Sequence, residues 1–209
     1  MGAAMQRWRQ SGFTLIELMV TLAVLVVLAM LAVPSFATLI EKSRLRGATD
    51  DVVSLLNNSR SNAVKLGTIT NVSMVGSAGT WCAGAISQAS PQTTSATAGA
   101  ALGATGSTCD CSATTVTCQV AGQNALVSSG GYTGVSLSSV GGNLLNSNGG
   151  ISFDPKLGAL YPLPTTATVL PTVVLLSKSG KYSTQINISP LGQVYACTAS
   201  GSMSGYPSC

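Results

Sequence analysis

The chain has one long apolar run near its N-terminus and then changes character twice. An uncharged stretch of 23 residues runs from Leu18 to Ile40, and as a helix it is long enough to cross about 30 Å of hydrocarbon. Between 41 and 67, apolar residues recur at spacings of three and four, which predicts an amphipathic helix that ends at Gly67. The predicted core-facing stripe comprises Leu45, Ala48, Val52, Leu56, Ser59, Ala63 and Leu66.

From residue 68 onward, apolar and polar residues alternate between closely spaced turn signals, which predicts strands. We expect strands at 69–75, 80–86, 115–120, 135–140, 150–153, 169–177, 183–189 and 194–198. They would form a small sandwich or a pair of antiparallel sheets, so the predicted fold class is α+β, with the long helix packed on a β-rich head. Segment 87–107 is rich in Ala, Thr, Ser and Gly, and we interpret it as a flexible insertion, with a contact surface inside a fibre as the alternative.

The charges around the apolar run predict how it is oriented and processed. Arg7 and Arg9 precede the run, so the positive-inside rule keeps the leader in the cytoplasm and exports everything after about Ile40, although the basic residues at 42–46 compete. A secretory signal is cleaved after its apolar region, whereas the candidate processing point here, Gly12-Phe13, precedes it. Cleavage at that point would keep the helix in the mature protein.

Glu17 is a carboxylate at the edge of this apolar run, and such a charge costs about 2.5 to 3.5 kcal/mol at a bilayer centre. Cleavage would create a positively charged amine at Phe13, and opposite charges attract strongly in a low dielectric. The two groups are poorly placed to pair within one straight helix, so the amine of a neighbouring subunit is the natural partner of Glu17. The alternative is a capping box, because Thr14-x-x-Glu17 also fits that pattern.

The sequence Gly-Phe-Thr-Leu-Ile-Glu at 12–17, followed by a long apolar helix, resembles the class III signal of type IV pilins and type II secretion pseudopilins. The resemblance implies that prepilin peptidase cuts between Gly12 and Phe13 and methylates Phe13, that Glu17 acts in assembly, and that Pro34 loosens the helix. It divides the chain into a leader (1–12), a transmembrane and assembly helix (13–40), an amphipathic helix (41–67) and a periplasmic β-rich head (68–209). The protein would be a single-pass inner-membrane protein before its incorporation in a filament.

Three further stretches are similar to motifs of the GspH/FimT family of minor pilins and minor pseudopilins: the helix end at 58–67, Ile-Ser-Phe-Asp-Pro-x-x-Gly at 151–158 and Ile-Ser-Pro-Leu-Gly-Gln-Val at 188–194. The resemblance implies a low-abundance subunit that initiates or caps a type IV pilus. Its partners would be other minor pilins, the major pilin and an inner-membrane assembly platform. A minor pseudopilin at the tip of a type II secretion endopilus is the alternative.

The six cysteines, Cys82, Cys109, Cys111, Cys118, Cys197 and Cys209, all follow the apolar run, on the side expected to be exported. An even count in an oxidising compartment predicts disulfides. Because pilins commonly close a C-terminal loop in this way, the resemblance favours Cys197 with Cys209, and the other four would form two more bridges. We expect no metal site or cofactor, because the chain has no His and its cysteine spacing is not that of zinc knuckles.

The sequence gives little support for a catalytic or a DNA-binding function. Without His, no catalytic triad can be assembled, so we do not expect an enzyme, and Asp154 is interpreted as a turn residue before a proline. Some FimT-type proteins bind DNA through a Gly-Arg-x-Arg motif, but Gln193 and Tyr195 occupy the arginine positions here. Removing the leader also leaves eight basic and six acidic side chains, a net charge of +2, so DNA uptake is disfavoured.

Overall fold

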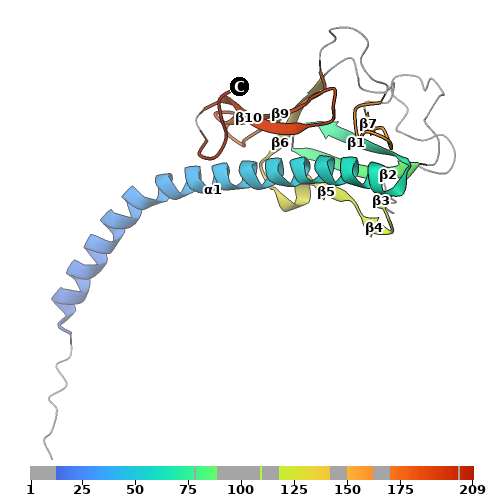
Figure 1. Ribbon diagram of the computed structural model, residues 1–209. Helices are drawn as coiled ribbons and strands as arrows, with labels where there is room; N and C mark the ends of the chain where they lie inside the picture. Colours follow the sequence, from blue (N-terminus) through green and yellow to red (C-terminus); the bar gives the residue numbers. More distant parts are fainter. Residues whose placement is uncertain are drawn as a thin grey trace, which may run out of the picture. The chain divides into compact units, whose positions relative to one another are not determined.

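The computed structural model describes residues 13–77, 79–88, 109, 118–141, 150–161, 170–201 and 203–209, without the side chains of 31–34, 77, 88 and 139–141. The chain divides into two units, Met1–Ile40 and Glu41–Cys209. Helix α1 (Leu15–Leu66) contributes to both units (Figure 1). The predicted leader lies outside the described residues, and so does the predicted insertion at 87–107 except for Ser87 and Gln88, which end a strand.

In the first unit, α1 begins where Thr14 provides a cap. The Thr14 hydroxyl oxygen accepts a hydrogen bond from the backbone N–H of Glu17 at 3.3 Å, which satisfies one of the free donors at the helix start. Within the described residues, no single helix meets a length and hydropathy criterion for a membrane span. Leu15–Met30 and Ser35–Leu66 meet it together, as a bent pair.

In the second unit, the helix buries the predicted stripe against the head. Leu45, Ala48 and Leu56 are fully buried, and Val52, Ser59 and Ala63 are no more than 1% exposed. Leu66 is the exception. Its side chain is 42% exposed, and it is the last residue of the helix. Gly67 then adopts a φ of +63°, and the Thr68 N–H donates to the Ala63 carbonyl at 3.2 Å, which is the Schellman pattern of a glycine C-cap.

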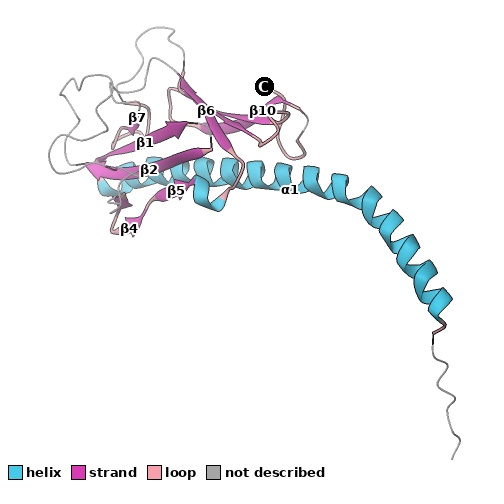
Figure 2. Ribbon diagram, turned by 180° about the vertical axis from the view of Figure 1, so that it is seen from behind, coloured by secondary structure: helices cyan, strands magenta, loops and turns pink. Residues whose placement is uncertain are grey.

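The head contains two four-stranded antiparallel sheets and a two-stranded ribbon (Figure 2). The first sheet has the order β5-β2-β1-β7, the second β10-β9-β8-β6, and the ribbon pairs β3 with β4. The strands are β1 (Ile69–Ser77), β2 (Thr80–Gln88), β3 (Gln119–Val120), β4 (Gln123–Asn124), β5 (Leu126–Ser128), β6 (Ser136–Gly141), β7 (Gly150–Phe153), β8 (Thr172–Leu176), β9 (Ser183–Ile188) and β10 (Val194–Ser200). The predicted α+β fold is thereby confirmed, and β4 and β5 are strands that the sequence pattern did not predict.

A single buried cluster joins α1 to both four-stranded sheets. Val72 and Phe153 enter it from the first sheet, and Val173 and Ile186 from the second, all at most 1% exposed. Each such side chain contributes about 1.5 to 3 kcal/mol by leaving water. A buried hydrogen bond of 2.7 Å between the hydroxyls of Thr49 in α1 and Thr184 in β9 adds a polar link to this core. Figures 1 and 2 show the sheets lying along the C-terminal half of the helix.

Candidate assembly site and the contacts of the head

The first candidate site is the start of α1, where Phe13 and Glu17 lie. Phe13 directly precedes the capping residue, and its side chain is 77% exposed. The backbone of Glu17 uses the Thr14 cap, but the Glu17 carboxylate makes no hydrogen bond or ion pair with any described residue. Of the two hydrogen bonds of the predicted capping box, only the one from the Glu17 N–H to the Thr14 hydroxyl is therefore present among these residues. The carboxylate is left available to a group that is not in this part of the chain.

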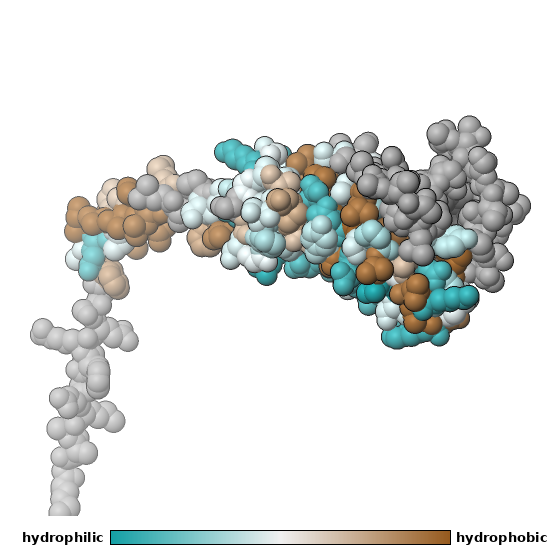
Figure 3. All heavy atoms as spheres, turned by 45° about the horizontal axis from the view of Figure 1, so that its top comes forward, coloured by the Kyte–Doolittle hydropathy of each residue, from teal (hydrophilic) through white to brown (hydrophobic). Residues whose placement is uncertain are grey.

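The surface around Glu17 is apolar on every side of the helix. The described large apolar side chains from Phe13 to Ile40 are 48 to 77% exposed, and Figure 3 shows hydrophobic residues over much of the first part of the helix on the face in view. A helix that is apolar all round is stable only in lipid or against other apolar helices. The backbone of Pro34 is part of α1 between the stretches that end at Met30 and begin at Ser35, and its side chain lies outside the description. The roles of Gly12, Phe13, Glu17 and Pro34 in processing and assembly stay predictions.

Charged residues in the first turns of the second unit bind loops of the head. The Glu41 carboxylate accepts a hydrogen bond from the Ser179 N–H at 2.6 Å, and hydrogen bonds from the side chain and backbone of Ser179 lower the pKa of Glu41. The Lys42 ammonium lies 4.5 Å from the centre of the Tyr182 ring, a cation–π contact. Arg44 donates to the Thr133 carbonyl at 3.1 Å. These contacts fix the turn between β8 and β9 and the loop before β6.

Two tyrosines add to this set of contacts. We call the set the helix collar, and its helical residues, the collar residues, are Glu41, Lys42, Arg44, Arg46, Asp50 and Asp51. Tyr132 donates its hydroxyl hydrogen bond to Asp51, which raises the pKa of Tyr132 to about 12. Tyr206 donates to Asp50, and burial together with this hydrogen bond raises the pKa of Tyr206. Arg46 donates to the Ser204 carbonyl at 3.4 Å and lies 3.7 Å from the Asp50 carboxylate. The collar was missed in the sequence, because its partners lie 81 to 160 residues apart and share no motif.

The C-terminal tail is held on the edge of the second sheet by a disulfide. Cys197 in β10 is bonded to Cys209, which is the pairing that the family resemblance favoured. The Thr198 N–H donates to the Pro207 carbonyl at 2.7 Å, and the Cys209 N–H donates to Thr198 at 3.1 Å. The tail thus continues the sheet beyond β10, and the collar residues Arg46 and Asp50 hold it from the helix side.

Cys109 is bonded to Cys118, and this disulfide packs on β2. A Cβ built on Gly84 would lie 2.2 Å from the Cys109 sulfur, so only glycine fits beneath the bond. Cys82 is disulfide-bonded as well, whereas Cys111 lies outside the described residues. In the part of the chain that the structure describes, no group of three or more His, Cys, Asp or Glu side chains is arranged to hold a metal ion.

The three stretches that resemble the GspH/FimT motifs meet at one corner of the head. The Arg60 Nε donates to the Gly158 carbonyl at 2.9 Å, and a Cβ on Gly192 would lie 2.0 Å from that same carbonyl oxygen. Asp154 accepts hydrogen bonds from two backbone N–H groups of its own turn, those of 156 and 157, which confirms its predicted role as a turn residue. Near the end of the helix, Arg60 therefore contacts both the turn after β7 and the turn before β10.

The positions relevant to DNA binding are exposed but carry no positive charge. Tyr195 is 53% exposed, and Gln193, which directly precedes β10, is exposed as well. The small basic spot of Lys178 and Lys181 precedes β9, whereas Gln193 lies beside the opposite end of that strand, since Val194 pairs with Ile188. The lysines and the two motif positions therefore do not form one phosphate-binding surface.

Comparison with known proteins gives a match to a family motif and a similar relative. Residues 9–33 match the prokaryotic N-terminal methylation motif, a stretch that includes the Gly12-Phe13 junction and Glu17. The chain is also similar to the type II secretion system core protein G of Aeromonas hydrophila, with 47% identity over 53 residues. That similarity covers 25% of this chain and 37% of the relative, so the chain spans little more than a third of the protein it matches. No solved structure matches.

Proposed function

We propose that this type IV pilin-like protein, with its N-terminal methylation motif and its helix packed on antiparallel sheets, is a minor subunit that helps to initiate or cap a type IV pilus. Its role is mechanical, and it needs no turnover of a substrate. The observation that carries the proposal is the Glu17 carboxylate, which has no partner among the described residues and lies within a helical surface that is apolar on all sides.

Processing by prepilin peptidase supplies the missing partner. Cleavage between Gly12 and Phe13 creates a new amine at Phe13, which the same enzyme methylates. Four residues of helix separate this amine from Glu17 by about 6 Å along the axis. In a filament, Glu17 of one subunit instead pairs with the amine of its neighbour, which removes the cost of an unpaired charge in an apolar environment. The same helix anchors the subunit in the inner membrane before assembly, with the head in the periplasm.

The head supports the assignment to the minor subunits. Its three GspH/FimT-like stretches are far apart in the sequence but meet at the contact of Arg60 with Gly158 and Gly192. As a minor subunit, the protein assembles with other minor pilins, a major pilin and an inner-membrane platform.

The second candidate is a minor pseudopilin of a type II secretion endopilus. The similarity to core protein G of such a system favours it. The N-terminal signal resembles that of both kinds of filament, so the neighbouring genes distinguish the two functions. A secretin and a secretion ATPase beside this gene would indicate secretion, whereas minor pilins beside a large tip adhesin would indicate a pilus.

The test separates processing, docking and membrane insertion. We expect Gly12→Ala to retain the leader, as measured by the mass of the membrane-bound protein. We expect Glu17→Ala to be processed and inserted normally but to enter sheared filaments at less than a tenth of the wild-type level. Thr21→Ala is the matched control, because among the described residues the Thr21 hydroxyl bonds only to the Leu18 carbonyl of its own helix. Normal incorporation of the Gly12 and Glu17 variants would refute the proposal.

DNA uptake is the third hypothesis, and one measurement decides it. The full chain in detergent micelles should not shift a DNA duplex in a gel at 50 mM salt, because Gln193 and Tyr195 supply no positive charge. A shift that disappears when Lys178 and Lys181 are replaced by Gln would instead establish a DNA-binding head.

A further inference from the structure

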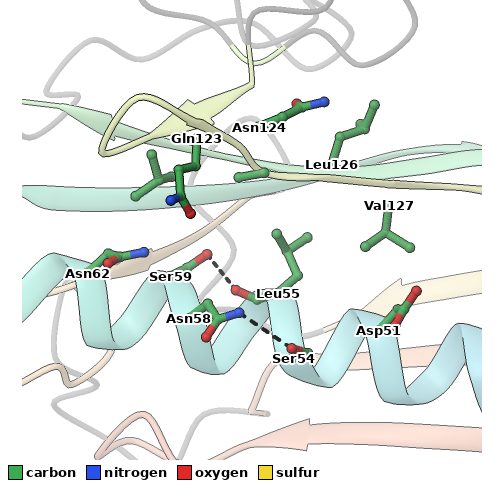
Figure 4. A pocket seen from close by; sticks show the side chains of 12 residues that line it. Asp51, Ser54, Leu55, Asn58, Ser59, Asn62, Gln123, Asn124, Leu126 and Val127 are labelled. Carbon is green, nitrogen blue, oxygen red and sulfur yellow. Dashed lines mark hydrogen bonds between the residues drawn. The ribbon is translucent and has the colours of Figure 1, made fainter.

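A groove of about 400 Å³ lies beside α1 in the second unit, and its lining does not include the residues that contact the C-terminal tail. One wall is a stripe of α1 that includes Ser54, Asn58 and Asn62, and the other wall is the backbone and side chains of 123–127. Figure 4 shows Gln123 and Val127 extending from the strand side toward the helix. None of the motifs discussed above accounts for this groove.

The strand that borders the groove is at the edge of its sheet. The first sheet has the order β5-β2-β1-β7, so among the described residues β5 pairs with β2 on one side only. Such an edge leaves backbone N–H and C=O groups able to pair with a further strand. A strand added beside β5 would extend the sheet over the exposed flank of α1. It would fill the groove and cover the helix stripe.

Seven of the twelve side chains that line the groove carry hydrogen-bonding groups, and the other five are apolar. The amides of Asn62, Gln123 and Asn124 make no side-chain hydrogen bond to another described residue. Asn58 makes one, donating to the Ser54 hydroxyl at 3.4 Å. The single charged lining residue is Asp51, at one end, and its carboxylate already accepts the hydroxyl hydrogen bond of Tyr132. A neutral polar ligand suits this lining, because a charged ligand would lose hydration without gaining an opposite charge.

The length of the groove fits an extended peptide. From Asp51 to Asn62 the helix wall rises by about 17 Å, at about 1.5 Å per residue. Five residues of extended chain cover the same distance at about 3.3 Å per residue. The edge strand would supply backbone pairing, and the amides on the opposite wall would select the side chains that point inward.

We propose that this groove, which we call the edge groove, accepts an extended, uncharged segment of another protein as a fifth strand beside β5. The inward-pointing side chains of that segment are small and polar, such as Ser, Thr or Asn, because they meet the amides of Asn58, Asn62 and Gln123. The proposal does not depend on processing at Gly12, so its failure would leave the proposed filament role intact.

The test is a selection from a phage-displayed library of random octapeptides on the full chain in detergent micelles. We expect uncharged peptides rich in Ser, Thr, Asn and β-branched residues. Their Kd should rise at least tenfold in Asn58→Glu and in Asn62→Glu, which place an unpaired charge in the edge groove. Asn57→Glu is the matched control, because it adds the same charge at an exposed neighbouring position of α1 that does not line the groove. Its Kd should remain at the wild-type value.

A second measurement separates strand addition from mere surface contact. Saturating peptide should slow amide hydrogen exchange in Leu126–Ser128 at least tenfold, because these amides belong to the edge strand. Selected peptides that bind without changing this exchange would overturn the proposal, as would the absence of peptides sensitive to Asn58→Glu and Asn62→Glu. Binding of a neutral oligosaccharide, such as maltohexaose, in place of peptides would assign the groove to a glycan and also overturn it.

Discussion

Gly192 should be one of the most sensitive single positions in the head, because it closes the corner where three separate segments meet. Its φ is +75°, a conformation that side chains other than glycine rarely adopt. A Cβ at this position would lie 2.0 Å from the Gly158 carbonyl oxygen and 3.0 Å from the Arg60 Nε. Gly192→Ala must therefore displace the carbonyl that Arg60 binds, and this loosens the helix end from both turns.

The cost of Gly192→Ala has two parts that the structure separates. The left-handed backbone alone costs about 1 to 2 kcal/mol for alanine. Forcing a methyl group into a packed contact adds about 1 to 3 kcal/mol. Gly180 has nearly the same φ, +70°, but a Cβ there meets nothing within 4 Å. Gly180→Ala therefore measures the backbone part alone, and Gly192→Ala should lower the free energy of unfolding by about 2 to 5 kcal/mol in total.

Urea unfolding of the full chain in detergent micelles measures both variants. Trp81 is 3% exposed in the head, so its fluorescence reports unfolding once Trp8, the second tryptophan of the chain, is replaced by Phe. We expect Gly192→Ala to be less stable than Gly180→Ala by at least 1 kcal/mol, the lower bound for a methyl group forced into a packed contact. Equal losses in the two variants would show that the corner is not packed as described, and would refute the reasoning.

Three further predictions use the same unfolding measurement. Replacing Cys197 and Cys209 by Ser, which opens a loop with a sequence separation of 12, should cost about 3 kcal/mol, and an unchanged urea midpoint would contradict the role of the tail. Thr49→Val should cost about 1 to 3 kcal/mol because it leaves the buried Thr184 hydroxyl without its partner, whereas Thr49→Ser should restore most of the loss. The lowered pKa of Glu41 means that its stabilising contribution is present above pH 4.5 and is lost as the pH falls through the lowered value. The stability difference between wild type and Glu41→Gln should therefore shrink in acid, and a constant difference would contradict it.

The parts of the fold that the sequence predicted are those with a local, repeated signal. The stripe from Leu45 to Ala63 predicts its own burial because each member faces the same side of one helix. Leu66 shares the spacing, but it is the last residue of α1 and its side chain is 42% exposed. β5 was missed because its three residues are too few to show alternation.

The functional residues also divide into those that a local sequence signal predicted and those that only the folded chain brings together. Gly12, Phe13 and Glu17 are recognisable because they lie within six consecutive residues and the motif match covers all of them. The edge groove has no such signal, since its walls are formed by residues near 58 and near 125 that only the folded chain brings together. Asn58 appeared in the sequence as part of a helix-end motif, and nothing in that motif indicates that its amide faces a strand edge.

The positions of the charges limit how the head can bind a partner. Six of the charged residues lie in the first turns of the second unit, and the helix collar uses them on the loops and the C-terminal tail of the head itself. Arg60 is similarly occupied by the Gly158 carbonyl. Charges engaged within the head are poor determinants of an external contact, because a partner would have to replace bonds that already exist. Apart from the lysines at 65, 156, 178 and 181, recognition by the head would then depend on neutral hydrogen-bonding groups and on strand edges such as that of β5 among the described strands, which is the chemistry of the edge groove.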